Sequence, residues 1–252
     1  MKKIITESFV KLVVVVALAL PFKSMANPPA NKIYNELLKK YVNEEGWVNY
    51  KGFIKEKELF QNYLDELSAN PPADGLGKDE KEAYWINAYN AFTIKLIMDH
   101  YPVKSIKDIG PKHQIPFLNT PWQKRFFTIG GKRMKLDRIE HQILRKQFED
   151  PRVHFAIVCA SRSCARLRNE AYEGGKLNEQ LNAQARNFLS DKRKNEITPS
   201  KAELSPYFTW FKKDFTKHGT VIQFINKYSN IKLKDNAVID EKDYDWDLNE
   251  QK

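Results

Sequence analysis

One segment of the sequence, residues 78–100, constrains the fold more than any other. It follows the loop Asp74-Gly75-Leu76-Gly77, ends just before Pro102, and has the composition of a helix. Apolar side chains surround it almost completely, at Tyr84, Trp85, Ile86, Ala88, Tyr89, Phe92, Ile94, Leu96 and Ile97. A helix that is apolar on all sides is normally buried. We therefore predict a helix at the centre of a domain.

The rest of the chain predicts further helices mixed with short strands. We expect helices at residues 32–41, 53–67, 136–148, 176–189, 207–215 and 221–228, and strands at 46–50, 153–159 and 196–198. Residues 126–135 predict a hairpin, because Gly130-Gly131 supplies the tight turn. The chain has 252 residues, of which 42% are hydrophobic, so a single hydrophobic core is sufficient for its fold. The predicted fold class is α+β: a single domain with a central buried helix packed with short strands and a β-hairpin, monomeric in solution.

The first 26 residues predict a signal peptide. Lys2, Lys3 and Lys11 precede the apolar run at 12–20, and Ser24-Met25-Ala26 offers small residues for cleavage. The run is shorter than the roughly 20 residues that span a bilayer, which argues against an integral membrane anchor. We expect cleavage near Ala26, a periplasmic or secreted protein, and one domain over residues 27–252.

Charge is unevenly distributed along the chain. Residues 121–168 contain twelve basic and four acidic residues, whereas residues 235–250 contain seven acidic residues against Lys242. The acidic strip could simply neutralise a basic face, or the basic face could bind an anion. Export would remove nucleic acid as a partner, so an anionic envelope polymer or a peptide substrate is expected. Trp246 and Leu248 are too apolar for a free tail, so we expect the strip to pack on the domain.

Two amides interrupt the apolar central helix. Asn87 and Asn90 are three residues apart and share a face, and a buried amide must be hydrogen-bonded. They either hold the backbone of a neighbouring loop or contact a substrate. Backbone bonding is the more common role of such amides.

A carboxylate falls inside the apolar stripe of the helix at 136–148. The stripe consists of Leu136, Ile139, Ile143, Leu144 and Phe148; Glu140 lies within it and His141 on its flank. A buried carboxylate needs a partner, and such groups are enriched at functional sites. Glu140 could instead form a purely structural pair with Arg145, Arg152 or Arg166.

Residues 150–168 carry the richest chemistry in the chain. If 153–159 is a strand, His154 and Cys159 point to opposite faces, whereas Cys164 lies beyond a polar turn and is free to return beside His154. Cys164, His154 and Glu140 would then supply a nucleophile, a proton shuttle and an orienting carboxylate. Arg162, Arg166 and Arg168 are close to Cys164 in sequence and would stabilise its thiolate. We predict that Asn87, Asn90, His141 and Arg166 bind the substrate.

The two cysteines could instead have a structural role. Two cysteines separated by four residues in an exported protein can form a disulfide, Cys159–Cys164. A zinc site of His141, His154, Cys159 and Cys164 would have suitable ligand types but not a standard spacing. We expect neither a metal nor a cofactor.

Four ordered blocks resemble the domain-of-unknown-function 547 family. They are Tyr84-Trp85-Ile86-Asn87-Ala88-Tyr89-Asn90-Ala91, Ile139 to Arg145, Asp150 to Ala156 with Cys159 and Ser163-Cys164, and Tyr244-Asp245-Trp246 with Leu248-Asn249. The resemblance runs from about residue 47 to 249. Ala165 stands where the familiar cysteine block has proline. Similar domains occur in proteins of intracellular character, which implies that the cysteines do more than form a disulfide. The family name supplies no reaction.

Two functions are therefore expected from the sequence. The first is a cysteine-dependent hydrolase or acyl transferase that acts on an envelope amide or ester. The second is a non-catalytic periplasmic binding domain for an anionic glycan or protein partner, with Cys159–Cys164 as a structural disulfide.

Overall fold

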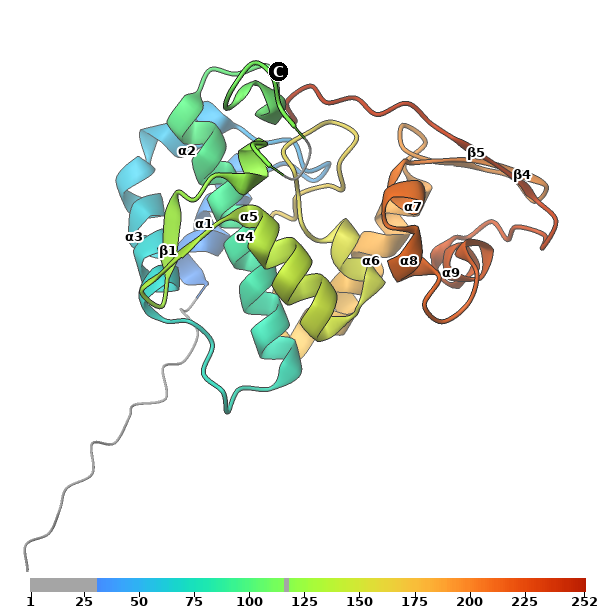
Figure 1. The fold of residues 1–252 in the computed structure, drawn as a ribbon, viewed down its shortest axis with the longest axis horizontal. Coiled ribbons are helices and arrows are strands. Elements are labelled where there is room, and N and C mark those ends of the chain that lie inside the picture. Colours follow the sequence, from blue (N-terminus) through green and yellow to red (C-terminus); the bar gives the residue numbers. More distant parts are fainter. Residues whose placement is uncertain (1–30, 116–117) are drawn as a thin grey trace, which may run out of the picture.

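The computed structural model describes residues 31–115 and 118–252, and the predicted signal peptide lies outside them. Four helices begin the described chain: α1 (Lys32–Tyr41), α2 (Tyr50–Lys55), α3 (Lys57–Ala69) and α4 (Lys78–His100). Figure 1 shows α4 in the middle of the helical body, with α1, α2 and α3 along one side. The prediction for α4 is confirmed at both ends, and most of its residues are buried.

The segment around α2 differs from its prediction. The strand expected at 46–50 is wrong, because only Val48 makes isolated bridges, to Val42 and Glu250. The side chain of Asn49 accepts the backbone N–H of Gly52 at 2.8 Å and thereby begins α2 at Tyr50. The single helix expected over 53–67 is consequently two helices, α2 and α3.

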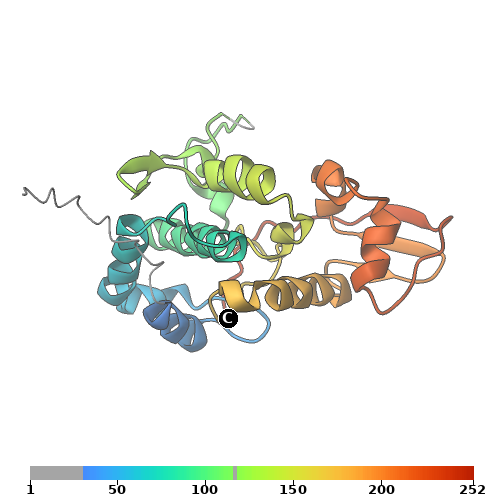
Figure 2. The same ribbon diagram turned by 90° about the horizontal axis from the view of Figure 1, so that it is seen from below.

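The predicted β-hairpin begins the segment that leads into helix η3 (Ile139–Phe148), which packs on α4. Strands β1 (Phe127–Ile129) and β2 (Lys132–Met134) pair antiparallel, and both turn glycines adopt positive φ, 57° at Gly130 and 73° at Gly131. After one turn of α-helix, α5 (Leu136–Arg138), the chain continues as the π-helix η3. Figure 2 shows α4 between η3 on one side and α6 (Leu177–Ser190) on the other. The predicted helix at 136–148 is thus confirmed as helical.

The strand expected at 153–159 is wrong. Asp150 accepts the N–H of Arg152 and Pro151 occupies the first turn, so the segment begins as the 3-10 helix η4 (Pro151–Phe155). The following backbone is satisfied by α4 rather than by a sheet: Asn90 donates to the carbonyl of Ala156 and accepts the N–H of Val158, each at 2.9 Å. Residues 153–159 are largely apolar because they lie buried in the centre of the domain. The periodicity of the sequence does not distinguish a buried segment of this kind from a buried strand.

The C-terminal third adds a small sheet and three short helices. The sheet contains β3 (Glu196–Ile197), β4 (Lys201–Leu204) and β5 (Val238–Glu241), with β4 in the middle, antiparallel to β3 and parallel to β5. Helices α7 (Tyr207–Trp210), α8 (Lys212–Phe215) and α9 (Val221–Tyr228) pack beside it (Figure 1). Single-turn 3-10 helices occur at η1 (Ile106–Asp108), η2 (Pro121–Gln123) and η5 (Gly174–Lys176). The fold is α+β, as predicted.

The C-terminal tail packs back on the domain. Backbone N–H groups of Leu248, Asn249 and Gln251 donate to the carbonyls of Lys104, Ala160 and Val48. The prediction that the acidic strip contacts the rest of the chain is confirmed, since Asp245 and Asp247 both pair with Arg162. Across residues 31–115 and 118–252, we find no helix with the length and apolar character needed to cross a membrane.

Candidate functional site

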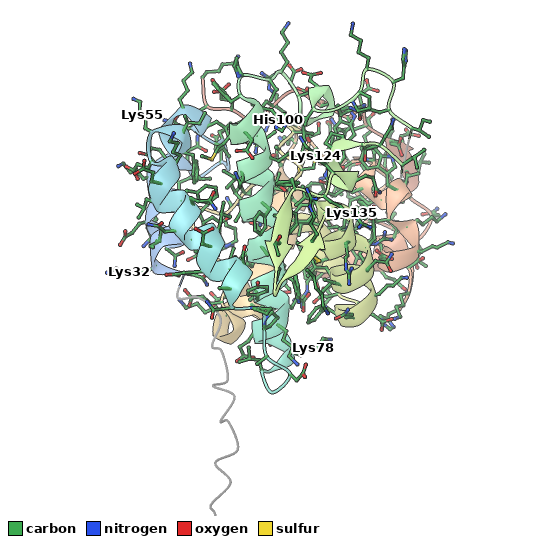
Figure 3. The ribbon with its side chains drawn as sticks, turned by 60° about the vertical axis from the view of Figure 1, so that its left-hand side comes forward. Lys32, Lys55, Lys78, His100, Lys124 and Lys135 are labelled. Carbon is green, nitrogen blue, oxygen red and sulfur yellow. The ribbon has the colours of Figure 1, made fainter. Side chains whose placement is uncertain are left out.

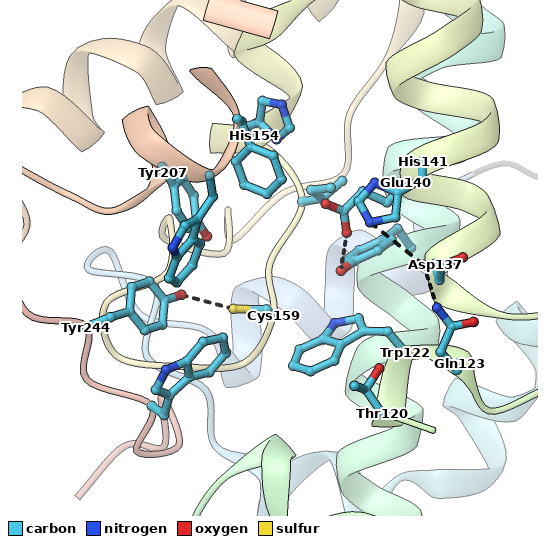
Figure 4. A pocket seen from close by; sticks show the side chains of 15 residues that line it. Thr120, Trp122, Gln123, Asp137, Glu140, His141, His154, Cys159, Tyr207 and Tyr244 are labelled. Atoms are coloured by element: carbon cyan, nitrogen blue, oxygen red, sulfur yellow. Dashed lines mark hydrogen bonds and ion pairs between the residues drawn. The ribbon is translucent and has the colours of Figure 1, made fainter. Parts of the chain in front are cut away.

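A pocket of about 490 Å³ opens where η2, α5 and η3 face α7 and the C-terminal tail (Figure 4). Its walls come from η2, from α5 and η3, from the loop after η4, from α7 and from the tail. Aromatic side chains predominate: Trp122, Trp210, Phe211, Tyr207, Tyr244 and Trp246 all line it. A concave, largely apolar pocket with a few polar groups is the usual form of a small-molecule site.

Cys159 supplies the thiol of this pocket. Its sulfur lies 3.1 Å from Ser161 Oγ and 3.2 Å from Tyr244 Oη, and these two hydroxyls are 2.8 Å apart. Hydrogen bonding by Cys164 lowers the pKa of Cys159, burial opposes this effect, and hydrogen bonds from Ser161 and Tyr244 lower the pKa further, to about 7. The thiol is therefore substantially ionised at neutral pH, which is the reactive form.

Cys164, the predicted nucleophile, does not line the pocket. It is 1% exposed, and its sulfur accepts the backbone N–H of Cys159 at 3.0 Å and the hydroxyl of Tyr207 at 3.0 Å. Burial, followed by its interaction with Cys159, raises the pKa of Cys164 well above the usual thiol value. The prediction rested on the strand that did not form. Both cysteines are free thiols, whereas the binding-domain alternative required a disulfide.

The residue after Cys159 has a strained backbone. Ala160 has φ of 60°, in the left-handed region that a side chain disfavours. Its carbonyl accepts the N–H of Asn249, so the tail holds this conformation. Such strain persists only where surrounding contacts determine it, and it clusters at functional sites.

Glu140 and His141 lie across the pocket from Cys159, as Figure 4 shows. Glu140 is 9% exposed and accepts a hydrogen bond from Tyr89 Oη at 3.2 Å. Arg145 Nη1 lies 2.7 Å from His141 Nδ1, so Nδ1 accepts and the proton of the neutral ring lies on Nε2. That nitrogen is 3.7 Å from a carboxylate oxygen of Asp137, which also lines the pocket.

His154 lines the pocket as well, but with a different carboxylate from the one predicted. Its Nε2 lies 2.8 Å from Asp214 Oδ2, and its ring stacks on Phe211 with centroids 3.8 Å apart. Burial lowers the pKa of His154, an effect that Asp214 opposes. Burial would raise the pKa of Asp214, but hydrogen bonds from His154 and Arg145 more than offset it. The predicted triad is therefore not formed: Glu140 bonds Tyr89, and His154 bonds Asp214.

Three of the predicted substrate-binding residues lie away from the pocket. Asn87 bonds both backbone groups of Tyr172 at 2.8 Å, and Asn90 bonds those after η4, so both amides of α4 hold neighbouring backbone instead of substrate. Arg166 donates to the carbonyl of Glu44 at 3.0 Å and to Gln184. His141 does line the pocket.

The basic segment 121–168 contributes two histidines to the lining, but neither lysine nor arginine. Lys124 contacts His100 near the end of α4 (Figure 3), and Lys135 pairs with Asp137. Several arginines bind acidic neighbours: Arg145, Arg152, Arg162 and Arg168 pair with Asp214, Asp150, Asp247 and Glu170. In the described part of the chain, the four residues considered as zinc ligands form no cluster that could hold a metal.

Sequence reasoning missed Cys159, Asp214 and Trp122 as pocket residues. Asp214 stands between charged and apolar neighbours, and no local pattern distinguishes it. A signal did exist for Tyr244 and Trp246, which belong to a block that resembles the family pattern. The structure places both rings in the pocket wall.

These features define an α+β protein with a low-pKa thiol in an aromatic pocket. Residues 73–189 match the family model described as protein of unknown function, DUF547, and the chain carries a domain of this family. The match is narrower than the resemblance over 47–249: it includes Cys159, Glu140 and His154 but excludes α7 and the tail. No curated protein and no solved structure matches the chain.

Proposed function

We propose that this protein is a cysteine-dependent hydrolase or acyl transferase acting on an amide or ester, with Cys159 as its nucleophile. The observation that carries the proposal is the thiol of Cys159, which faces a pocket of about 490 Å³ and has a pKa of about 7. A thiol that is ionised at neutral pH needs no separate base to become nucleophilic. Cys164, with its raised pKa and its burial, lacks both properties.

The proposed reaction proceeds through a thioester. The Cys159 thiolate attacks the carbonyl carbon, the bond to the leaving oxygen or nitrogen breaks, and the leaving group departs with a proton from water. Water then cleaves the thioester in a hydrolase, or an amine does so in a transferase. His141 lies on the opposite wall, where its Nε2–H, 3.7 Å from Asp137, is placed to donate to a polar atom of the bound substrate.

We place the substrate in the cell envelope. This placement rests on the predicted signal peptide, and the cleaved chain would then meet its substrate outside the cytoplasm. The aromatic wall favours a substrate that covers Trp122 and Trp210 with its own apolar or planar surface.

Turnover of a 4-nitrophenyl ester, with mass spectrometry of the acylated protein, tests this proposal. We expect acylation at Cys159 and a loss of about 100-fold or more in kcat/KM for Cys159→Ala. Cys164→Ala should retain turnover with its pH profile shifted upward, because the bond from Cys164 that lowers the Cys159 pKa is lost. Equal turnover by wild type and Cys159→Ala would disprove the proposal.

The pairing of the cysteines favours a second candidate function, thiol–disulfide exchange. An accessible thiol of low pKa beside a buried thiol of high pKa is the arrangement that exchange requires. Cys159 would attack a substrate disulfide and release one thiolate. Cys164 would then attack the mixed disulfide, form Cys159–Cys164 and release the second thiol.

The same Cys164→Ala variant distinguishes the two candidates. Exchange requires both sulfurs, so this variant should stop at a mixed disulfide with a substrate such as oxidised glutathione and should not release the second thiol. Acyl transfer requires only Cys159 and should survive. Reduction of the disulfide by wild type but not by Cys164→Ala, with no ester turnover by either protein, would favour the exchange function.

A further inference from the structure

One buried side chain of the pocket, Glu140, carries a carboxyl group. Glu140 is 9% exposed, and among the described residues it forms no ion pair. Tyr89 donates to Oε2, and within the same residues Oε1 has no hydrogen-bond partner. Removing a carboxylate from water without a compensating charge is unfavourable, so a site that retains one is suited to a cation.

The other charges around the pocket reinforce this character. Asp137 also lines it, but Lys135 lies 3.2 Å and Gln123 2.7 Å from its carboxylate, so it is already partnered. Neither lysine nor arginine is among the lining residues, although the whole chain has a formal charge of +10. The lining itself is therefore acidic, and the nearest cations, Lys135, Arg145 and Lys107, lie behind Asp137, His141 and Trp246.

The aromatic wall, which lies beside Cys159, suits the carbon chain of such a ligand. The ring of Trp246 lies 5.9 Å from that of Trp210, 6.1 Å from that of Trp122 and 4.4 Å from that of Tyr244. The ammonium of Lys107 already lies 4.6 Å from the centroid of Trp246. Because Lys107 already provides a cation for Trp246, these rings are suited to pack on the carbon chain of a ligand.

We infer that the pocket recognises a substrate with a primary ammonium group, which pairs with Glu140 on the wall opposite Cys159, while the aromatic rings beside Cys159 cover the rest of the substrate. This inference rests on the proposed function, because Cys159 lies across the pocket and the susceptible carbonyl must reach it. The substrate class is an acyl compound whose amine and carbonyl are separated by a short chain, as in a lysine-like side chain. An anionic group would meet Glu140 without a compensating cation in the lining.

Binding of matched amino-acid derivatives to the full chain carrying Cys159→Ala tests the inference without depending on turnover. The probes are the Nα-acetyl amides of lysine, norleucine and glutamate at one ionic strength, measured by calorimetry and tryptophan fluorescence. Norleucine matches the apolar part of lysine and lacks its charge. We expect lysine to bind at least tenfold more tightly than norleucine, and glutamate to bind most weakly.

A second comparison assigns the preference to Glu140. Adding Glu140→Gln should remove the tenfold difference, whereas Glu149→Gln, which neutralises a carboxylate outside the pocket, should leave it unchanged. Equal or tighter binding of norleucine or glutamate, or no binding of lysine, would overturn the inference, and this result needs no variant of Glu140. Ester turnover without a lysine preference would remove only the ammonium site; the preference without turnover would remove only the proposed reaction.

Discussion

The sulfur of Cys164 accepts the backbone N–H of Cys159 at 3.0 Å, so the two cysteines form one unit with an accessible and a buried thiol. The pKa values of the two thiols move apart for other reasons, because this N–H by itself lowers the pKa of Cys164. Cys164 stabilises the ionised form of Cys159, and burial beside that charge disfavours its own ionisation.

This asymmetry predicts selective alkylation. Iodoacetamide should modify Cys159 first, with a rate that rises through an apparent pKa near 7, and should modify Cys164 only slowly in the folded protein. Peptide mass spectrometry after timed alkylation between pH 5 and 9 measures both sites. Unfolding in denaturant supplies the control, because both thiols should then react at similar rates. Faster labelling of Cys164 in the native protein would contradict the assignment.

Tyr244 provides a separate test of the same thiol. Tyr244→Phe removes the hydroxyl 3.2 Å from the Cys159 sulfur, so the pKa of Cys159 should rise by about one unit. Alkylation at pH 7 should slow correspondingly. Tyr101→Phe is a matched control, since its hydroxyl bonds Glu250 at 2.7 Å instead of the thiol. An unchanged profile for Tyr244→Phe would show that this hydroxyl does not stabilise the thiolate.

The sequence predicted the helices better than the site. An apolar surface around residues 78–100 allows only a central helix, and α4 has those bounds. The run at 153–159 was equally apolar, but Asn90 satisfies its backbone from another element. Here a side chain of α4 makes the backbone hydrogen bonds that a neighbouring strand would otherwise make. The sequence of residues 153–159 does not reveal this.

The predicted site residues depended on the strand that was wrongly expected at residues 153–159. A regular strand would have separated His154 from Cys159 and favoured Cys164, whereas the observed loop presents Cys159 to the pocket. Asp214, the partner of His154, is 60 residues away in sequence. Contacts at such separation follow from the packing of α8 against η4, which local periodicity does not encode. Glu140, by contrast, was found because a charge in an apolar stripe is visible in sequence.

Glu82 predicts a pH-dependent stability difference. This side chain is 3% exposed, and burial, with a smaller contribution from Asp150, raises its pKa to about 7. The folded protein therefore binds more protons than the unfolded chain between about pH 4.5 and 7, and stability falls as pH rises through this window. Relative to wild type, Glu82→Gln should gain about 1–3 kcal/mol in the free energy of unfolding between pH 4.5 and 8.

Urea unfolding of both proteins across that pH range measures the difference. Glu80→Gln, at an exposed position of the same helix, controls for the loss of one negative charge. Parallel stability curves for wild type and Glu82→Gln would show that Glu82 does not titrate differently on folding.

Removal of residues 243–252 should destabilise the protein and slow its thiol chemistry. The deleted segment contains Leu248, 5% exposed, and Asn249, which accepts the hydroxyl of Tyr50 at 2.7 Å, in addition to Tyr244 and Trp246. Losing this buried surface should cost about 3–6 kcal/mol and lower Tm by about 10 °C. Removing only Lys252, which is exposed, is the control. Alkylation of Cys159 should slow as well, because the bond from Tyr244 is lost. Calorimetry measures Tm. An unchanged Tm for the longer deletion would show that the tail does not stabilise the fold.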